Sequence, residues 1–207
     1  MIEKLILAFV IAFLTAAIVG KVLVPWLRRI KAGQAIKENG PVWHMSKAGT
    51  PTMGGIIFIT ATVVVCLTVG FSNMMGGDYG HIFVLFLSLA FGAIGFLDDY
   101  EKLKKKQNLG LTAGKKFLLQ VAVAALFVFL LRNFGYLTPN LYVPFFNVDP
   151  IIMPEWFYFA FVIFVIVATV NAVNITDGVD GLATGTSLPV FFFYTAVAYA
   201  WGERFLS

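Results

Sequence analysis

The sequence predicts an all-α, polytopic integral membrane protein, and three observations point to that class. The 207 residues are 59% hydrophobic, with a mean hydropathy of +0.86. Charged residues make up only 13%, against about 25% in soluble domains. Apolar segments long enough to cross a bilayer recur along the chain, and the basic residues gather in two of the connections between them. We therefore expect one membrane domain over residues 1–207.

Six apolar segments are candidate spans, because about 17 to 25 such residues cross a hydrocarbon core. They are Leu5–Leu27, Gly54–Phe71, His81–Leu97, Phe117–Leu131, Phe157–Val173 and Leu182–Trp201. The first is too long for the apolar part of a signal peptide, and Arg28 and Arg29 follow it instead of a small-residue cleavage site. The second contains no Asp, Glu, Lys or Arg, and the third meets no charge until Asp98. We expect all six to span the membrane.

The connections predict the orientation, because loops rich in Lys and Arg remain in the cytoplasm. The first and third connections carry the basic residues Arg28, Arg29, Lys31, Lys37, Lys47, Lys102, Lys104, Lys105, Lys106, Lys115 and Lys116. The N-terminus is then outside, and the segment 171–185 lies on the cytoplasmic side. The outer segment 136–156 holds four prolines, which favour extended or turn structure, such as a small hairpin.

Two further features exclude classes of function. Cys66 is the only cysteine, so neither an intramolecular disulfide nor a cysteine metal cluster is possible within the chain. The net charge of +4 is concentrated in two loops between spans and not in a separate basic domain. We therefore expect no nucleic-acid partner. His44 and His81 are each isolated, and such histidines are more often interfacial residues than ligands.

The segment Asn171–Gly181 reads N-A-V-N-I-T-D-G-V-D-G and follows directly on an apolar stretch. Asn171, Asn174, Asp177 and Asp180 recur every third residue, so on a helical turn each lies beside the next. Converging oxygen atoms suit a hard divalent cation. The alternative is a polar turn between two spans, although a turn does not require this three-residue rhythm.

Asp98 and Asp99 follow the third span in G-F-L-D-D-Y-E-K, and lysines come directly after them. Successive helical side chains point about 100° apart, so one carboxylate can face a metal or nucleophile while the other accepts hydrogen bonds or pairs with a lysine. Lys102 and Lys106 are four residues apart and share a helical face that suits phosphate. The alternatives are a solvated helix end and the ordinary positive-inside signal.

The segment Ser46–Gly55 reads S-K-A-G-T-P-T-M-G-G and comes just before the second span. Its glycines permit close approach of the backbone, and exposed amides with a lysine can bind phosphate. The alternative is a simple helix entry in which Thr52 is the N-cap.

These three motifs together resemble the bacterial phospho-N-acetylmuramoyl-pentapeptide transferases (MraY, or translocase I), which belong to the polyprenyl-phosphate sugar-1-phosphate transferases. The resemblance implies transfer of phospho-MurNAc-pentapeptide from UDP-MurNAc-pentapeptide to undecaprenyl phosphate, giving lipid I and UMP in peptidoglycan synthesis. It also implies Mg²⁺, a multi-pass bacterial cell membrane protein with a cytoplasmic active site, and a homodimer. By motif we assign Asp98, Asp99 and Asp177 as catalytic, and Asp177 and Asp98 as metal ligands. The substrate-binding assignments are Lys47, Thr52, Lys102, Lys106, Asn171, Asn174 and Asp180, while Lys115 or Lys116 supplies a further lysine.

The resemblance covers only the N-terminal six-span part of these proteins, which have about ten spans. Their remainder contributes a His-rich loop and a further metal-binding Asp, which we expect in a continuation beyond Ser207. We therefore expect the 207 residues alone to be inactive. One alternative is a polyprenyl-phosphate GlcNAc-1-phosphate transferase that uses UDP-GlcNAc. A transporter or a non-catalytic membrane scaffold are alternatives of a different class, and carboxylates at one face argue against the transporter.

Overall fold

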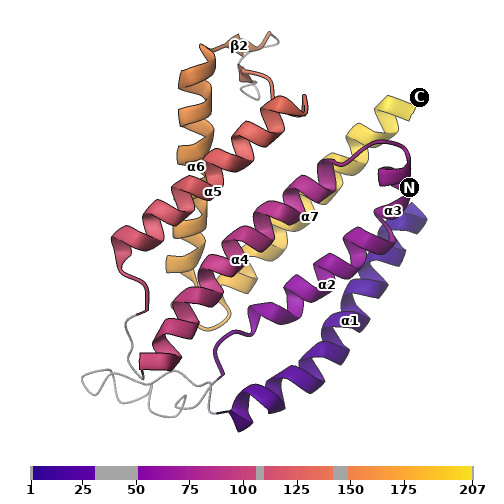
Figure 1. Ribbon diagram of the computed structural model, residues 1–207. Helices are drawn as coiled ribbons and strands as arrows, with labels where there is room; N and C mark the ends of the chain where they lie inside the picture. Colours follow the sequence, from indigo (N-terminus) through magenta and orange to yellow (C-terminus); the bar gives the residue numbers. More distant parts are fainter. Residues whose placement is uncertain (1, 31–50, 106–109, 142–148, 207) are drawn as a thin grey trace.

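The computed structural model describes residues 2–30, 51–105, 110–141 and 149–206, with side chains as far as residue 200. Its described part contains seven helices and a two-stranded hairpin, which confirms the predicted all-α class (Figure 1). The helices are α1 (Ile2–Arg29), α2 (Gly55–Thr68), α3 (Phe71–Met75), α4 (Gly80–Lys105), α5 (Ala113–Asn133), α6 (Glu155–Thr176) and α7 (Leu182–Leu206). The strands are β1 (Asn140–Leu141) and β2 (Ile151–Ile152).

Five of these helices are long and apolar enough to cross a membrane, and α2 is a shorter apolar helix of 14 residues. The five are α1, α4, α5, α6 and the part of α7 from Leu182 to Ala200. The helix α4 continues for eight residues beyond the predicted span end at Leu97, so the charged segment that follows is helical as well. Residues 98–105 therefore continue the axis of the membrane-spanning part of α4.

The second predicted span, Gly54–Phe71, is divided in the structure, because α2 ends at Thr68 and α3 begins at Phe71. Gly70 lies at this break and has no room for a side chain. A Cβ atom there would be 2.3 Å from the carbonyl oxygen of Cys66 and 2.7 Å from Nε2 of His81. The glycine thus allows α2 to end tightly against the first turn of α4.

Replacing Gly70 by alanine is expected to destabilise the protein by roughly 1 to 3 kcal/mol, the usual cost of forcing extra atoms into a packed site. Thermal unfolding in detergent measures the change. Gly95→Ala on α4 is the matched control, because a Cβ at Gly95 meets nothing within 4 Å. Equal melting temperatures for the two variants would contradict the packing at Gly70.

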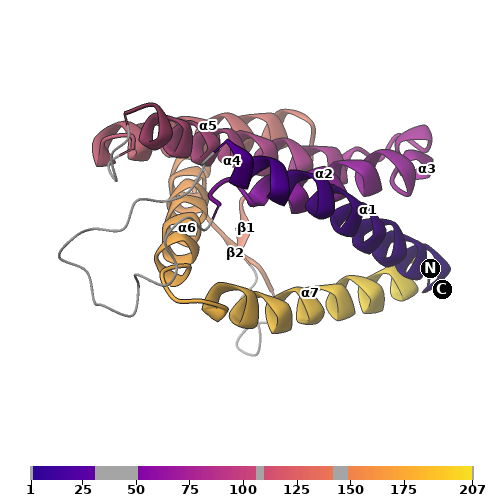
Figure 2. The same cartoon turned by 90° about the horizontal axis from the view of Figure 1, so that it is seen from below.

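Neighbouring helices pack in chain order: α1 against α2, α2 against α4, α4 against α5, α5 against α6, and α6 against α7. Seen from below, α1, α2, α4 and α5 form one layer, while α6 stands at one end and leads to α7 opposite (Figure 2). The buried apolar residues, found in helices of this layer and in α6, are Leu27, Ala61, Leu85, Ile94, Ala124, Phe127, Val128 and Val167. Most other large apolar side chains are exposed, as expected where lipid is the solvent.

The two ends of the helices differ in what they carry. The charged end of α4, the start of α2 and the α6–α7 turn lie toward the lower end in Figure 1, whereas the N-terminus and the hairpin lie toward the upper end. The hairpin pairs Asn140 with Ile152 and Leu141 with Ile151 in antiparallel register, which confirms the predicted hairpin. Beside it, Arg132 at the end of α5 forms an ion pair with Glu155 at the start of α6. The motif-bearing segments that the structure describes therefore share one end.

Candidate active site at the charged end of α4

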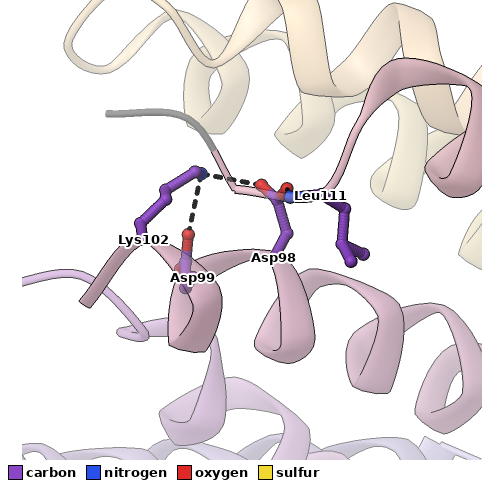
Figure 3. Close-up of polar contacts among 4 residues, drawn as sticks. All are labelled: Asp98, Asp99, Lys102 and Leu111. Atoms are coloured by element: carbon purple, nitrogen blue, oxygen red, sulfur yellow. Dashed lines mark hydrogen bonds and ion pairs between the residues drawn. The ribbon is translucent and has the colours of Figure 1, made fainter. Parts of the chain in front are cut away.

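Asp98, Asp99 and Lys102 form one ion-paired cluster in the last two turns of α4 (Figure 3). The ammonium of Lys102 lies 2.7 Å from Oδ2 of Asp98 and 3.1 Å from Oδ1 of Asp99. These contacts follow from helical spacing, because residues three and four apart lie side by side. The positive charge of Lys102 offsets the repulsion between the two adjacent carboxylates and holds both toward the same ammonium group.

Asp98 has a second partner from outside its own helix. Its Oδ1 accepts a hydrogen bond from the main-chain N–H of Leu111 at 2.9 Å, although the two residues are 13 apart in sequence. The segment that leads into α5 therefore folds back onto the end of α4. Only 9% of Asp98 remains exposed, whereas Asp99 is half-buried.

Lys115 and Lys116, at the start of α5, act on different carboxylates of α4. Lys116, which is half-buried on α5, lies close enough for its charge to act on the carboxylate of Asp98. The exposed Lys115 acts instead on Glu101. Glu101 itself pairs with Lys105 at 2.5 Å. Of the two lysines between which the motif did not decide, Lys116 is the one whose charge acts on Asp98.

Asn171 is held by a residue that the motifs did not identify. Its Nδ2 donates to Oε1 of Gln120 on α5 at 2.8 Å and to the carbonyl oxygen of Val167 at 2.8 Å. Gln120 is 2% exposed and lies inside the predicted span Phe117–Leu131, where a lone amide is costly unless it finds a partner. That lone amide in an apolar run was the available sequence signal. The two amides fix α6 against α5 at the first residue of the N-A-V-N-I-T-D-G segment.

Replacing Gln120 by leucine is expected to lower stability by about 0.6 to 1.7 kcal/mol, the mean and the maximum found for hydrogen bonds between membrane helices. The substitution removes the acceptor for Asn171 while keeping a side chain of similar volume. Ser88→Ala on α4 is the control, since Ser88 donates only to the carbonyl of Val84 in its own helix. Thermal unfolding of both variants measures the difference, and an unchanged Gln120→Leu protein would contradict the role of the pair.

The predicted three-residue rhythm continues only partly through the α6–α7 connection. Asn171 and Asn174 lie in α6, Asp177 is its C-cap, and Asp180 lies in the turn before α7. Asn174, Asp177 and Asp180 are exposed. Gly181 has φ of +76°, a conformation that glycine adopts without strain and that turns the chain into α7. These oxygens lie at the same end of the fold as the α4 cluster, as Figure 1 shows.

The segment before α2 has an unusual backbone. Met53 adopts φ of +67°, the left-handed region that non-glycine residues rarely occupy and that often marks functional loops. Thr52 is half-buried beside it. The N-cap of α2 is Gly54, without a side-chain cap, so the alternative interpretation of Thr52 as N-cap was wrong.

Some of the predicted residues fall outside the part of the chain that the structure describes. Among the site residues these are Lys47 and Lys106, and the isolated His44 is a third. Ser207, beyond which a further metal-binding Asp is expected, also lies outside the described residues. The expected Asp therefore stays a prediction.

The structure thus brings Asp98, Asp99 and Lys102 together, with Lys116 near enough for its charge to act on Asp98, and places the α6–α7 turn at the same end of the fold. Within the described segments, α5 packs against both α4 and α6, and no hydrogen bond or ion pair connects Asp98 to Asp177. Nor do three or more His, Cys, Asp or Glu gather there into a metal site. A single cavity shared by all these residues stays a prediction.

A polytopic α-helical membrane protein with paired carboxylates and lysines at one end fits the membrane enzymes that handle phosphorylated substrates. Comparison with known families supports this class: the sequence model of glycosyl transferase family 4 matches residues 81–207. The chain therefore belongs to glycosyl transferase family 4. A second match, over residues 47–59, is to the phospho-N-acetylmuramoyl-pentapeptide-transferase signature 1, and it includes Thr52 and Met53.

Curated relatives carry the same name as that signature. The chain is 43% identical over 196 residues to the phospho-N-acetylmuramoyl-pentapeptide-transferase of Listeria innocua, covering 94% of this chain and 59% of that protein. The corresponding protein of Staphylococcus carnosus is 41% identical over 94% of this chain and 60% of its own length. That of Geobacillus thermodenitrificans is 39% identical over 97% and 61%. The chain spans about three fifths of the length of these relatives.

Proposed function

We propose that the chain is part of a transferase that moves phospho-MurNAc-pentapeptide from UDP-MurNAc-pentapeptide to undecaprenyl phosphate. The products are lipid I and UMP, and the step belongs to peptidoglycan synthesis. The observation that carries this proposal is the match to the signature over residues 47–59, whose described part leads into the start of α2 at the same end of the fold as the Asp98–Lys102 cluster. The names of the relatives agree with it.

The reaction requires phosphate groups to approach one another against strong charge repulsion. An oxygen of undecaprenyl phosphate forms a bond to the sugar-linked phosphorus, while the bond from that phosphorus to the bridging oxygen breaks and UMP leaves with the electron pair. Catalysis of such transfers is mostly alignment and charge neutralisation. Lys102 and Lys116 are the described lysines at the acidic pair, and they would hold phosphate oxygens there.

In this proposal Asp98 orients or deprotonates the attacking lipid phosphate, and Asp99 supports the position of Lys102. A phosphate monoester has a second pKa of about 6, so it is already largely ionised near neutral pH. Orientation is therefore the larger task. Direct attack by Asp98, with a phospho-aspartyl intermediate, is the competing mechanism, and trapping of labelled protein in a single turnover would favour it.

The residues present fit Mg²⁺ in their chemistry, since the ion prefers carboxylate oxygens and is usually held by one or two of them together with substrate phosphates and water. Asp98 and Asp177 are the proposed ligands, and Asp177 is exposed at the end of α6. The bound ion would supply neutralisation of charge on the leaving UMP. The proposal includes a cytoplasmic site in the bacterial cell membrane and a homodimer.

The test is an assay of the complete gene product in detergent with undecaprenyl phosphate, Mg²⁺ and either UDP-MurNAc-pentapeptide or UDP-GlcNAc. The proposal expects UMP release and a lipid-linked product with the first donor, both lost on addition of EDTA and restored by Mg²⁺. Turnover of UDP-GlcNAc alone would identify the alternative transferase. Release of no UMP from either donor would favour a scaffold, and vesicle uptake of an anionic solute without UMP release would favour a transporter.

A further inference from the structure

The carboxylate of Asp98 has two partners, and one of them belongs to a part of the chain outside α4. Lys102 pairs with its Oδ2 at 2.7 Å, and the main-chain N–H of Leu111 donates to its Oδ1 at 2.9 Å (Figure 3). Both carboxylate oxygens are thus engaged, whereas the ion pair of Asp99 involves one oxygen and the shared lysine. Two fixed partners on different oxygens restrict the side chain to one orientation.

The contact with Leu111 depends on the residue before it. A Cβ atom at Gly110 would lie 2.4 Å from Oδ1 of Asp98, 2.5 Å from its carbonyl oxygen and 2.9 Å from its Cγ. Real Cβ atoms do not approach other atoms so closely, and two of these three contacts are with the carboxylate itself. Any other residue at position 110 would push this segment away from α4. Gly110 is needed for close approach, as where a backbone must come near a functional group.

We propose that Gly110 and the main-chain amide of Leu111 are positioning elements for Asp98, and that they act as a backbone clamp on its carboxylate. The inference rests on the proposed function, since it assigns the clamp the task of aiming Asp98 at the substrate phosphate. Neither element touches substrate. A displacement of about 1 Å at a reacting group can lower the rate roughly 100-fold, which gives the size of the effect expected when the clamp opens.

The clamp is tested in the complete gene product by comparing alanine at two glycines. Gly110→Ala is expected to lower kcat roughly 100-fold while KM for the UDP-sugar changes by less than about threefold, because substrate-binding groups stay in place. Gly114→Ala, four residues later, is the matched control, since a Cβ there meets nothing within 4 Å. It should leave kcat within about twofold. An equal loss in both variants, or a loss in KM alone, would overturn the proposal.

Two substitutions at Leu111 separate the amide from the side chain. Leu111→Ala keeps the N–H and should retain kcat within about threefold, whereas Leu111→Pro removes the donor and should match Gly110→Ala. If Leu111→Ala lost as much as Leu111→Pro, side-chain packing and not the amide would be responsible, and the clamp would be wrong. If Gly110→Ala fails to fold, the comparison of Leu111→Pro with Leu111→Ala still tests the clamp.

A double-mutant cycle in thermal stability tests the contact independently of any activity. Leu111→Pro should lower the melting temperature clearly in the wild-type background and much less in an Asp98→Ala background, where the acceptor is gone. Equal shifts in both backgrounds would overturn the clamp. If the cycle shows coupling but the wild-type protein turns over neither UDP-sugar, the proposed function fails and the contact at Asp98 stands as structural only.

Discussion

Replacing Asp98 by asparagine is expected to lower the turnover of the complete gene product roughly 100- to 10,000-fold, the range associated with a positioned acid or base. Asparagine keeps the shape of the side chain and can still accept from the N–H of Leu111 through its oxygen. It carries no negative charge, however, and its NH₂ group cannot accept from the ammonium that lies 2.7 Å from Oδ2 in the native protein. UMP release under saturating substrates measures the loss.

Glu101→Gln is the matched control for Asp98→Asn. Glu101 lies on the same helix and also pairs with a lysine four residues later, whereas the main-chain hydrogen bond from Leu111 goes to Asp98. The loss of Glu101 should change turnover less than about twofold, as expected for an ion pair at the surface. Similar losses in the two variants would mean that the general charge of this helix end matters and that Asp98 has no special task.

Replacing Lys102 by methionine is the second change with a large expected effect, a loss of turnover of roughly 100- to 1,000-fold. Removing one preorganised donor from a site of developing charge typically costs this much. The ammonium of Lys102 bridges both carboxylates, so without it Asp98 and Asp99 repel each other and the proposed phosphate contact disappears. The same UMP assay, with KM for the UDP-sugar determined in parallel, measures the outcome.

Lys105→Met supplies the comparison for Lys102→Met. Lys105 is exposed and pairs with Glu101 instead of the acidic pair, and its loss also removes one positive charge from the same segment. Turnover should change less than about twofold. If both lysine variants lost activity equally, the lysines would act only through the positive charge of the segment, and the bridging role of Lys102 would be refuted.

Much of the fold was predictable because each span is a local property of the sequence. The apolar run His81–Leu97 and the charges after it marked the end of a membrane segment, and the four prolines in the segment 136–156 indicated extended structure. The limits of α2 were not predictable in this way. The break near Gly70 depends on the ring of His81 and the carbonyl of Cys66, and the contact with His81 forms only when α2 and α4 pack.

In the candidate site, too, the contacts within one helix were predictable from the sequence, whereas those between separate elements were not. Helical spacing predicted that one carboxylate of the acidic pair can take a lysine, and the structure shows Lys102 paired with both Asp98 and Asp99. The hydrogen bond from Leu111 and the charge of Lys116 come from outside α4, so no periodicity along α4 contains them. Gln120 had a signal of its own, a single amide within an apolar run, but its partner Asn171 is 51 residues away. The assignment of Asn174, Asp177 and Asp180 to the same site is still a prediction.

The most direct test of the account is whether the end of α4 and the α6–α7 turn belong to one substrate site. In the complete gene product with its native cysteines replaced, single cysteines are placed at Lys104, at Val179 and, as an outer control, at Ile152, and labelled with a membrane-impermeant thiol reagent in sealed vesicles. The account predicts that Lys104→Cys and Val179→Cys react from the same side and are both protected by UDP-MurNAc-pentapeptide, while Ile152→Cys reacts from the other side and is not. Labelling of the first two from opposite sides, or protection of only one, would contradict it.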